Sequence, residues 1–205
     1  QRLDGRSLVS EWQQAHPQGA YVWNAEQLKA AASAPAILGL FEPDHMQYEH
    51  ERTRDAAGEP SLAELTRTAI ANLARHKEGY VLMIEGARID HANHSGNAYR
   101  ALTDTVAMSD AVRVATEMTR DDDTLIIVTA DHSHTLNFVG YPARGNAILG
   151  KVKDKGGEDG MGALDLARDG MGMPYTTLSY ANGPGYTGAS NQQPAGPKRF
   201  PHSPS

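Results

Sequence analysis

The sequence has no cysteine among its 205 residues. Disulfide bonds, thiolate metal sites and cysteine nucleophiles are therefore excluded, while the redox compartment stays open. Aromatic residues make up only 6%, and no apolar run approaches the roughly 18 residues of a membrane-spanning helix. Positive charge is also scarce, since 19 Lys and Arg stand against 25 Asp and Glu, without a Lys/Arg cluster. This composition argues against binding through the phosphate backbone of nucleic acids.

The chain also lacks an initiator methionine, and its opening, QRLDGRSLVSEWQ, does not have the pattern of a signal peptide. We expect the interior of a longer protein. With 40% hydrophobic residues, the chain is long enough for one domain or a large piece of one. We expect a single α/β domain fragment over 1–205, with a core at 1–150. The segment 151–205 holds 10 of the 20 glycines and 6 of the 11 prolines, which predicts loops.

Short apolar runs rich in strand-forming residues alternate with helical patterns. The runs predict buried strands at 36–41, 80–84 and 124–130. Between them, apolar residues at the helical period predict amphipathic helices at 61–76, where Ser61 and Glu64 have capping-box spacing, and at 98–115. This rhythm indicates a three-layer α/β sandwich, with a largely parallel central sheet covered by helices on both faces. Within 151–205, only 176–180 reads as a strand, and disorder is the alternative for the last 18 residues.

Carboxylates and histidines follow two of the predicted strands, in the segments EGARIDHANH and TADHSH. The residues concerned are Glu85, Asp90, His91 and His94 in the first segment, and Asp131, His132 and His134 in the second. Ligands of parallel α/β sheets bind at the carboxyl ends of the strands. Asp90 and His94 are four residues apart, so in a helical turn they face one point, as zinc requires, whereas Glu85 offers the hard oxygen that magnesium prefers. The set predicts a two-metal site with oxygen and nitrogen ligands, although helix caps or solvated loop residues are the alternative for either segment alone.

Other kinds of site have little support. There is no phosphate-binding glycine loop with Lys and Ser/Thr, and no nucleophile elbow of the form GxSxG. We read Ser133 as a loop residue and Asp121 to Asp123 as a solvated turn. The histidines outside the two segments read as surface or packing residues; they are His16, His45, His50, His76 and His202.

Four segments resemble blocks of the alkaline phosphatase family, in the family's order. They are LFEPDHMQYEHER, GYVLMIEGARIDHANH, DDDTLIIVTADHSHTLNFVGYPARGNAILG and PYTTLSYANGPGY. The resemblance implies one magnesium ligand, Glu85, and two zinc ions, one held by Asp90 and His94 and the other by Asp131 and His132. It further implies that His134 orients Asp90 and that His91 has an auxiliary role. Some relatives bind an additional calcium, for which Glu42 and Glu59 stand at the matching places, exposed surface acids being the alternative reading.

The same resemblance implies hydrolysis of small phosphate monoesters through a phosphoserine intermediate, with release of inorganic phosphate. One zinc polarises the leaving oxygen, and the other lowers the pKa of the nucleophile. The family also implies a homodimer and a periplasmic or secreted location.

Several family elements are absent from this sequence. They are the nucleophilic serine in its Asp-Ser-Ala context, the arginine that clamps phosphate, an N-terminal aspartate shared by the metals, and the third protein ligand of one zinc, a histidine near the family's C-terminus. We therefore expect an internal fragment of an alkaline phosphatase that is inactive alone. The alternatives are a catalytically incomplete metal-binding chain, or a phosphodiesterase, sulfatase or phosphomutase of the wider superfamily.

Overall fold

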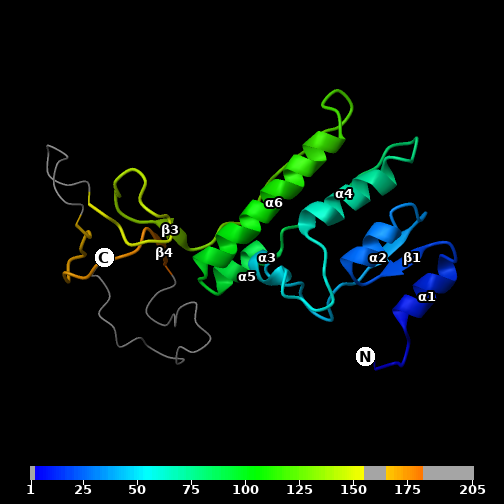
Figure 1. Cartoon of the computed structure of the whole chain (residues 1–205), viewed down its shortest axis with the longest axis horizontal. Coiled ribbons are helices and arrows are strands. Elements are labelled where there is room, and N and C mark those ends of the chain that lie inside the picture. Colours follow the sequence, from blue (N-terminus) through cyan, green and yellow to red (C-terminus); the bar gives the residue numbers. More distant parts are fainter. Residues whose placement is uncertain (1–2, 155–164, 182–205) are drawn as a thin grey trace. The chain divides into compact units, whose positions relative to one another are not determined.

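The computed structural model describes residues 3–154 and 165–181. The chain divides into two compact units (Figure 1). The first consists of Gln1–Ile89 and Leu102–Thr129, and the second of Asp90–Ala101 and Ala130–Ser205. Within the described residues, no helix is both long enough and apolar enough to cross a membrane.

The first unit begins with short helices and a pair of strands. Its elements are α1 (Leu8–Ala15), β1 (Ala20–Val22), α2 (Ala25–Ala30), β2 (Ile37–Gly39), α3 (Glu49–Arg52) and α4 (Leu62–Leu73). Strand β2 lies within the predicted strand 36–41 and pairs in parallel with β1, with Ala20 opposite Ile37. A Cβ atom at Gly39 would lie 2.8 Å from the ring of Phe41, so a larger residue at this strand end would require that ring to move.

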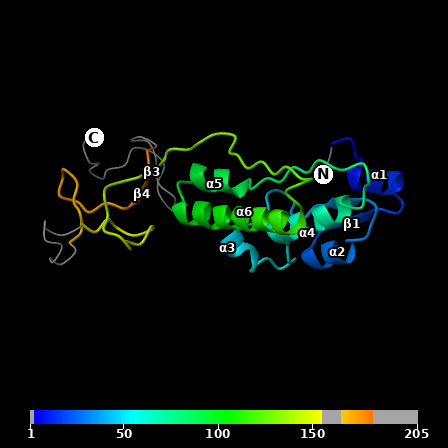
Figure 2. The same ribbon diagram turned by 90° about the horizontal axis from the view of Figure 1, so that it is seen from above.

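The two long predicted helices are confirmed. Helix α4 begins after Ser61, whose hydroxyl accepts from the amide of Glu64 while the Glu64 carboxylate accepts from the amide of Ser61, which completes the expected capping box. Helix α6 (Ala98–Met118) covers the second predicted helix and extends it by three residues at its C-terminal end. In the first unit, α4 and α6 run alongside each other in both views (Figure 2).

The strands predicted at 80–84 and 124–130 do not form among the described residues. Exposure alternates along the first segment, where Val81 and Met83 are 97% and 87% exposed while their neighbours are half-buried, as in an extended chain. The main-chain groups of 80–84 and 125–128 form no hydrogen bond with the backbone of another described residue. The prediction was wrong in this respect because a strand exists only when a neighbouring strand completes its ladder, which an apolar run does not reveal.

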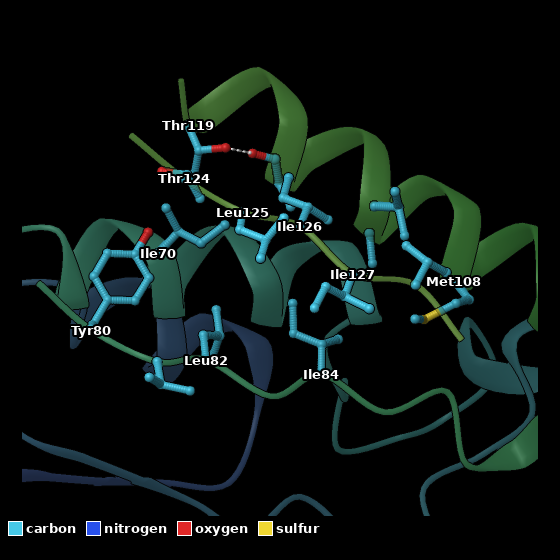
Figure 3. Close-up of a pocket in the computed structure, with 15 residues that line it drawn as sticks. Ile70, Tyr80, Leu82, Ile84, Met108, Thr119, Thr124, Leu125, Ile126 and Ile127 are labelled. Atoms are coloured by element: carbon cyan, nitrogen blue, oxygen red, sulfur yellow. Dashed lines mark hydrogen bonds between the residues drawn. The ribbon is translucent and has the colours of Figure 1, made fainter. Parts of the chain in front are cut away.

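An apolar cavity of about 350 Å³ opens between these two segments and the helices α4 and α6 (Figure 3). Leu82 and Ile84 point toward it from one segment, and Leu125 and Ile127 lie on its other side. Apolar side chains on both faces of an extended segment are typical of strands buried in a parallel sheet. The sequence pattern thus predicts apolar neighbours on both faces of these two segments, whereas the described residues supply them on one face only.

The second unit contains Asp90 to His94 of the first candidate ligand segment and every candidate ligand of the second. Its described elements are most of α5 (Arg88–His94), the first turn of α6, and the strands β3 (Leu136–Phe138) and β4 (Leu178–Tyr180). Strands β3 and β4 pair antiparallel, with Leu136 opposite Tyr180, and β4 forms the last three residues of the predicted strand 176–180. Val152 is almost fully buried, and its amide donates to the carbonyl of Tyr175. The predicted disordered tail lies outside the described residues.

Candidate metal centre

Helix α5 brings several side chains of the first candidate ligand segment, EGARIDHANH, close together. The helix ends at His94, because Gly96 adopts a positive φ of 61° and the amide of Asn97 returns to the carbonyl of Ala92. Asp90 and His94 are thereby one helical turn apart, with Nε2 of His94 3.5 Å from Oδ2 of Asp90. His91 lies between them, and its carbonyl accepts from the amide and hydroxyl of Ser95.

The second ligand segment meets this helix through a histidine. The Nε2 of His134 donates to Oδ1 of Asp90 at 2.7 Å, and His134 has a side chain only 18% exposed. The His94 and His134 rings meet edge to face with 4.8 Å between centroids. Nε2 of His132 is 3.6 Å from the same Asp90 oxygen. The carboxylate of Asp90 is therefore surrounded by three imidazoles.

These imidazoles determine the charge state of Asp90. The hydrogen bond from His134 is the largest of the influences that lower the pKa of Asp90, and the positive charge that His94, His134 and His132 can carry acts in the same direction. Asp90 is therefore held as a carboxylate, the form that binds a metal ion.

The chemistry of the cluster suits zinc. Asp90, His94 and His134 each offer one ligand atom, and these atoms lie within 4.8 Å of one another. One carboxylate oxygen with two imidazole nitrogens, and no sulfur, is a common set for a catalytic zinc with an open position. The structure thus brings His134 into ligand range as well as against Asp90.

The other expected zinc ligands lie next to each other in the same unit. Nε2 of His132 is 3.3 Å from Oδ2 of Asp131, and Nδ1 of His132 is 3.1 Å from the carbonyl of Ser133. The Asp131 side chain is 88% exposed. The Asp131 carboxylate, paired only with His132 among the described residues, is therefore accessible to a metal ion.

Glu85 belongs to the first unit and lines a cavity of about 240 Å³ there. The same cavity is lined by Glu59, which the sequence analysis considered as an exposed acid or a calcium ligand. The exposed-acid reading is wrong for Glu59, because only 2% of the residue is exposed. Its position follows from contacts that the local sequence does not specify: Oε1 accepts from the amide of Gln47 at 2.7 Å, and the amide of Glu59 donates to Asp55.

The two carboxylate oxygens of Glu59 differ in their hydrogen bonding. Oε2 is buried without a hydrogen-bond partner, and burial is the main cause that raises the pKa of Glu59, with the nearby charges of Asp55 and Glu42 adding to it. A buried, unpartnered carboxylate oxygen fits a hard cation such as calcium, whose ligands are oxygens.

One contact beside the cluster of Asp90, His94 and His134 has no counterpart in the sequence analysis. The hydroxyl of Tyr180 donates to Oδ1 of Asn93 at 2.8 Å, and Asn93 lies in α5 immediately before His94. The partner, 87 residues away, could not be identified from the pattern.

The family model described as alkaline phosphatase matches residues 1–198 of this chain. Among curated proteins, the chain is 44% identical over 190 residues to a membrane-bound alkaline phosphatase of Bombyx mori and 40% identical to the tissue-nonspecific alkaline phosphatase of Rattus norvegicus. Each match covers 90% of this chain but only 32% and 34% of the relative. The chain thus spans about a third of the length of these relatives.

Solved structures of two bacterial proteins are also similar. The alkaline phosphatase of Thermus thermophilus has a TM-score of 0.52 at 35% identity, over 57% of this chain and 24% of that one. A cold-active alkaline phosphatase from Shewanella sp. has a TM-score of 0.56 at 25% identity, over 70% of this chain and 35% of that one. These likenesses support an α/β fold of the same kind.

Proposed function

The chain belongs to the alkaline phosphatase family, and on that premise we propose that it is part of an enzyme that hydrolyses phosphate monoesters through a phosphoserine intermediate. The observation that carries this proposal is the cluster of Asp90, His94 and His134, since the family's reaction depends on metal ions. In the proposal, Asp90 and His94 hold one zinc, Asp131 and His132 hold the other, and Glu85 holds magnesium.

The chain's own residues prepare this site. His134 fixes one oxygen of Asp90 by a hydrogen bond and keeps the carboxylate ionised, while the other oxygen, 3.5 Å from Nε2 of His94, would face a metal ion together with that histidine. His91 follows Asp90 in α5 and takes the auxiliary place near the phosphate. When bound, the two zinc ions polarise the leaving oxygen and lower the pKa of the nucleophile. The metal ions also supply the positive field that a chain with a net charge of −6 lacks.

The remaining parts of the reaction are assigned to polypeptide outside these 205 residues. The nucleophilic serine, the arginine that binds phosphate and the third protein ligand of one zinc have no match in this sequence. We place them in the two thirds of the relatives' length that this chain does not cover. The same polypeptide would pair with 80–84 and 124–128 and complete the three-layer sandwich, with the 205 residues forming one α/β domain fragment within it.

A calcium site is a further part of the proposal. Glu42 and Glu59 would hold the ion, supported by the buried and unpartnered Oε2 of Glu59 and by the effect of Glu42 on the pKa of Glu59. The substrates would be small phosphate monoesters. We further propose a homodimer and a periplasmic or secreted location, for which family membership is the support.

The decisive experiment is Asp131→Ala in the complete polypeptide. We expect hydrolysis of a phosphate monoester to be abolished and the zinc content to fall by one ion per chain. Asp121→Ala, in the solvated turn before 124–128, is the matched control and should retain both. Undiminished turnover of the Asp131→Ala variant would overturn the proposed function.

Two measurements separate this function from its alternatives. Hydrolysis rates for a phosphate monoester, a phosphate diester and a sulfate ester distinguish an alkaline phosphatase from other members of the superfamily, and the monoester should be preferred. The intact denatured mass of the natively isolated, active protein should exceed that of the 205-residue chain well beyond error. An active species with the mass of this chain alone would mean that the nucleophile lies within it.

A further inference from the structure

We propose that Tyr180 is a positioning residue for the metal centre. Through its hydrogen bond to Asn93, it fixes the rotation of α5 about its own axis and so keeps Asp90 and His94 turned toward His134. The inference concerns residues to which neither the sequence nor the family comparison assigned a role, and it rests on the proposed zinc site.

Tyr180 is held to the segment that carries His134. Tyr180 lies opposite Leu136 in the β3–β4 pair, and Leu136 follows His134 by two residues. In addition, the amide of Ala181 donates to the carbonyl of Thr135 at 2.9 Å. The main chain around Tyr180 and the main chain after His134 therefore move together. A contact from the Tyr180 side chain to α5 ties the helix to the same piece of structure that provides His134.

Two hydrogen bonds then connect α5 with His134 and with Tyr180, at different points of one helical turn. Asp90 contacts His134 at 2.7 Å, and Asn93, three residues further on, contacts Tyr180 at 2.8 Å. Successive residues of an α-helix are rotated by about 100°. A single contact at Asp90 would let the helix roll around that point, whereas a second contact at Asn93 opposes the roll. His94, the next residue, is thereby kept on the side that faces His134.

The second contact is shielded from water. Asn93 is only 9% exposed, its neighbour Ala92 is fully buried, and Tyr180 is partly buried. A hydrogen bond in such surroundings has little competition from solvent, so its loss costs more than the loss of an exposed one. The side chain of tyrosine suits the task because it is rigid beyond two torsion angles and carries its hydroxyl at the far end.

The test is Tyr180→Phe in the complete polypeptide, which removes the hydroxyl and leaves the ring. Zinc affinity is measured by competition with a chromophoric chelator, and the geometry of the site by the visible absorption spectrum of the cobalt-substituted protein. We expect zinc affinity at one site to fall about 10-fold, at the lower end of the range for groups that orient metal ligands. The cobalt bands should shift, which a purely structural role of Tyr180 would not cause.

Tyr175→Phe is the matched control. Tyr175 lies in the same unit, and the described residues offer its hydroxyl no hydrogen-bond partner, so zinc affinity and the cobalt spectrum should match those of the unaltered protein. Asn93→Ala tests the other end of the bond and should weaken zinc binding to a similar extent. The double variant of Tyr180 and Asn93 should lose no more than the stronger single variant, because both substitutions remove one interaction.

The outcomes are distinct. Wild-type zinc affinity and an unshifted cobalt spectrum in Tyr180→Phe would overturn the inference and leave the proposed function standing. Additive losses in the double variant would also overturn it, since the two residues would then act separately. An unaltered complete protein that binds no zinc would overturn the proposed function and this inference with it.

Discussion

His134 and Asp90, 44 residues apart in the chain, meet at 2.7 Å in the second unit. The contact explains why a carboxylate on a partly exposed helix is firmly ionised, because the imidazole donates a hydrogen bond to it and so lowers the pKa of Asp90. It also connects the segments TADHSH and EGARIDHANH, so the loss of His134 should alter the orientation of Asp90.

His134→Ala therefore should weaken zinc binding by about 10- to 100-fold in the complete polypeptide, as the loss of a group that orients a metal ligand usually does. Chelator competition measures this effect. His76→Ala, which removes an exposed histidine after α4, should bind zinc as the unaltered protein does. Equal affinities of both variants would mean that the Asp90–His134 contact has no part in metal binding.

Glu59→Gln tests the calcium site. Comparing this variant with the unaltered protein also tests a pH dependence of the free energy of unfolding. Burial raises the pKa of Glu59, so the folded protein holds this proton more tightly than the unfolded chain does. Without calcium, the free energy of unfolding should therefore decrease as pH rises from the ordinary carboxyl pKa through the raised one. The glutamine variant, which has no proton to lose, should not show this decrease.

Calcium should stabilise the unaltered protein relative to Glu59→Gln. At a calcium concentration 100 times the dissociation constant, binding adds about 2.7 kcal/mol to the free energy of unfolding of the unaltered protein. Thermal or urea unfolding with and without calcium measures this gain, which Glu59→Gln should lack. Glu78→Gln, in the turn after α4, is the control and should keep it. A full calcium response in Glu59→Gln would exclude Glu59 as a ligand.

The capping box of α4 gives a prediction about stability. Ser61→Ala should lower the free energy of unfolding by about 1 kcal/mol at neutral pH, because the amide of Glu64 loses its acceptor. Hydrogen bonds from the amide and hydroxyl of Ser61 lower the pKa of Glu64. The contribution of Glu64 is therefore fully present above its unfolded pKa and is lost as pH falls through the lower folded value. Urea unfolding at pH 7 and pH 3 should show a smaller loss for Ser61→Ala in acid.

Hydrogen exchange tests the environment of the unpaired segments. In the complete polypeptide, the amides of 80–84 and 125–128 should be strongly protected, because the apolar faces of these segments predict a strand partner on each side. In the 205-residue chain alone, they should exchange as fast as exposed loops, since the described residues offer them no backbone partner. Fast exchange in the complete polypeptide would remove the support for the proposed sandwich.

Much of the local structure could be predicted from the sequence. Helix α4 carries its own start signal in Ser61 and Glu64 and an apolar stripe, and α6 has apolar residues near the helical period between Ala98 and Ala115. Both features act within a few residues of the chain, so they are readable without knowledge of the fold. The ligand segments could be recognised because they combine uncommon residue types at fixed spacing.

What the sequence by itself determined was that the two long segments α4 and α6 are helical, which runs are apolar, and which residues have metal-binding chemistry. Only the tertiary structure decided that Glu59 is buried, that His134 contacts Asp90, and that Tyr180 reaches Asn93. Each of these depends on contacts between residues that are distant in the chain, or on an environment assembled from several segments. Local propensity does not encode such contacts, because their free energy arises only when the separate segments have packed together.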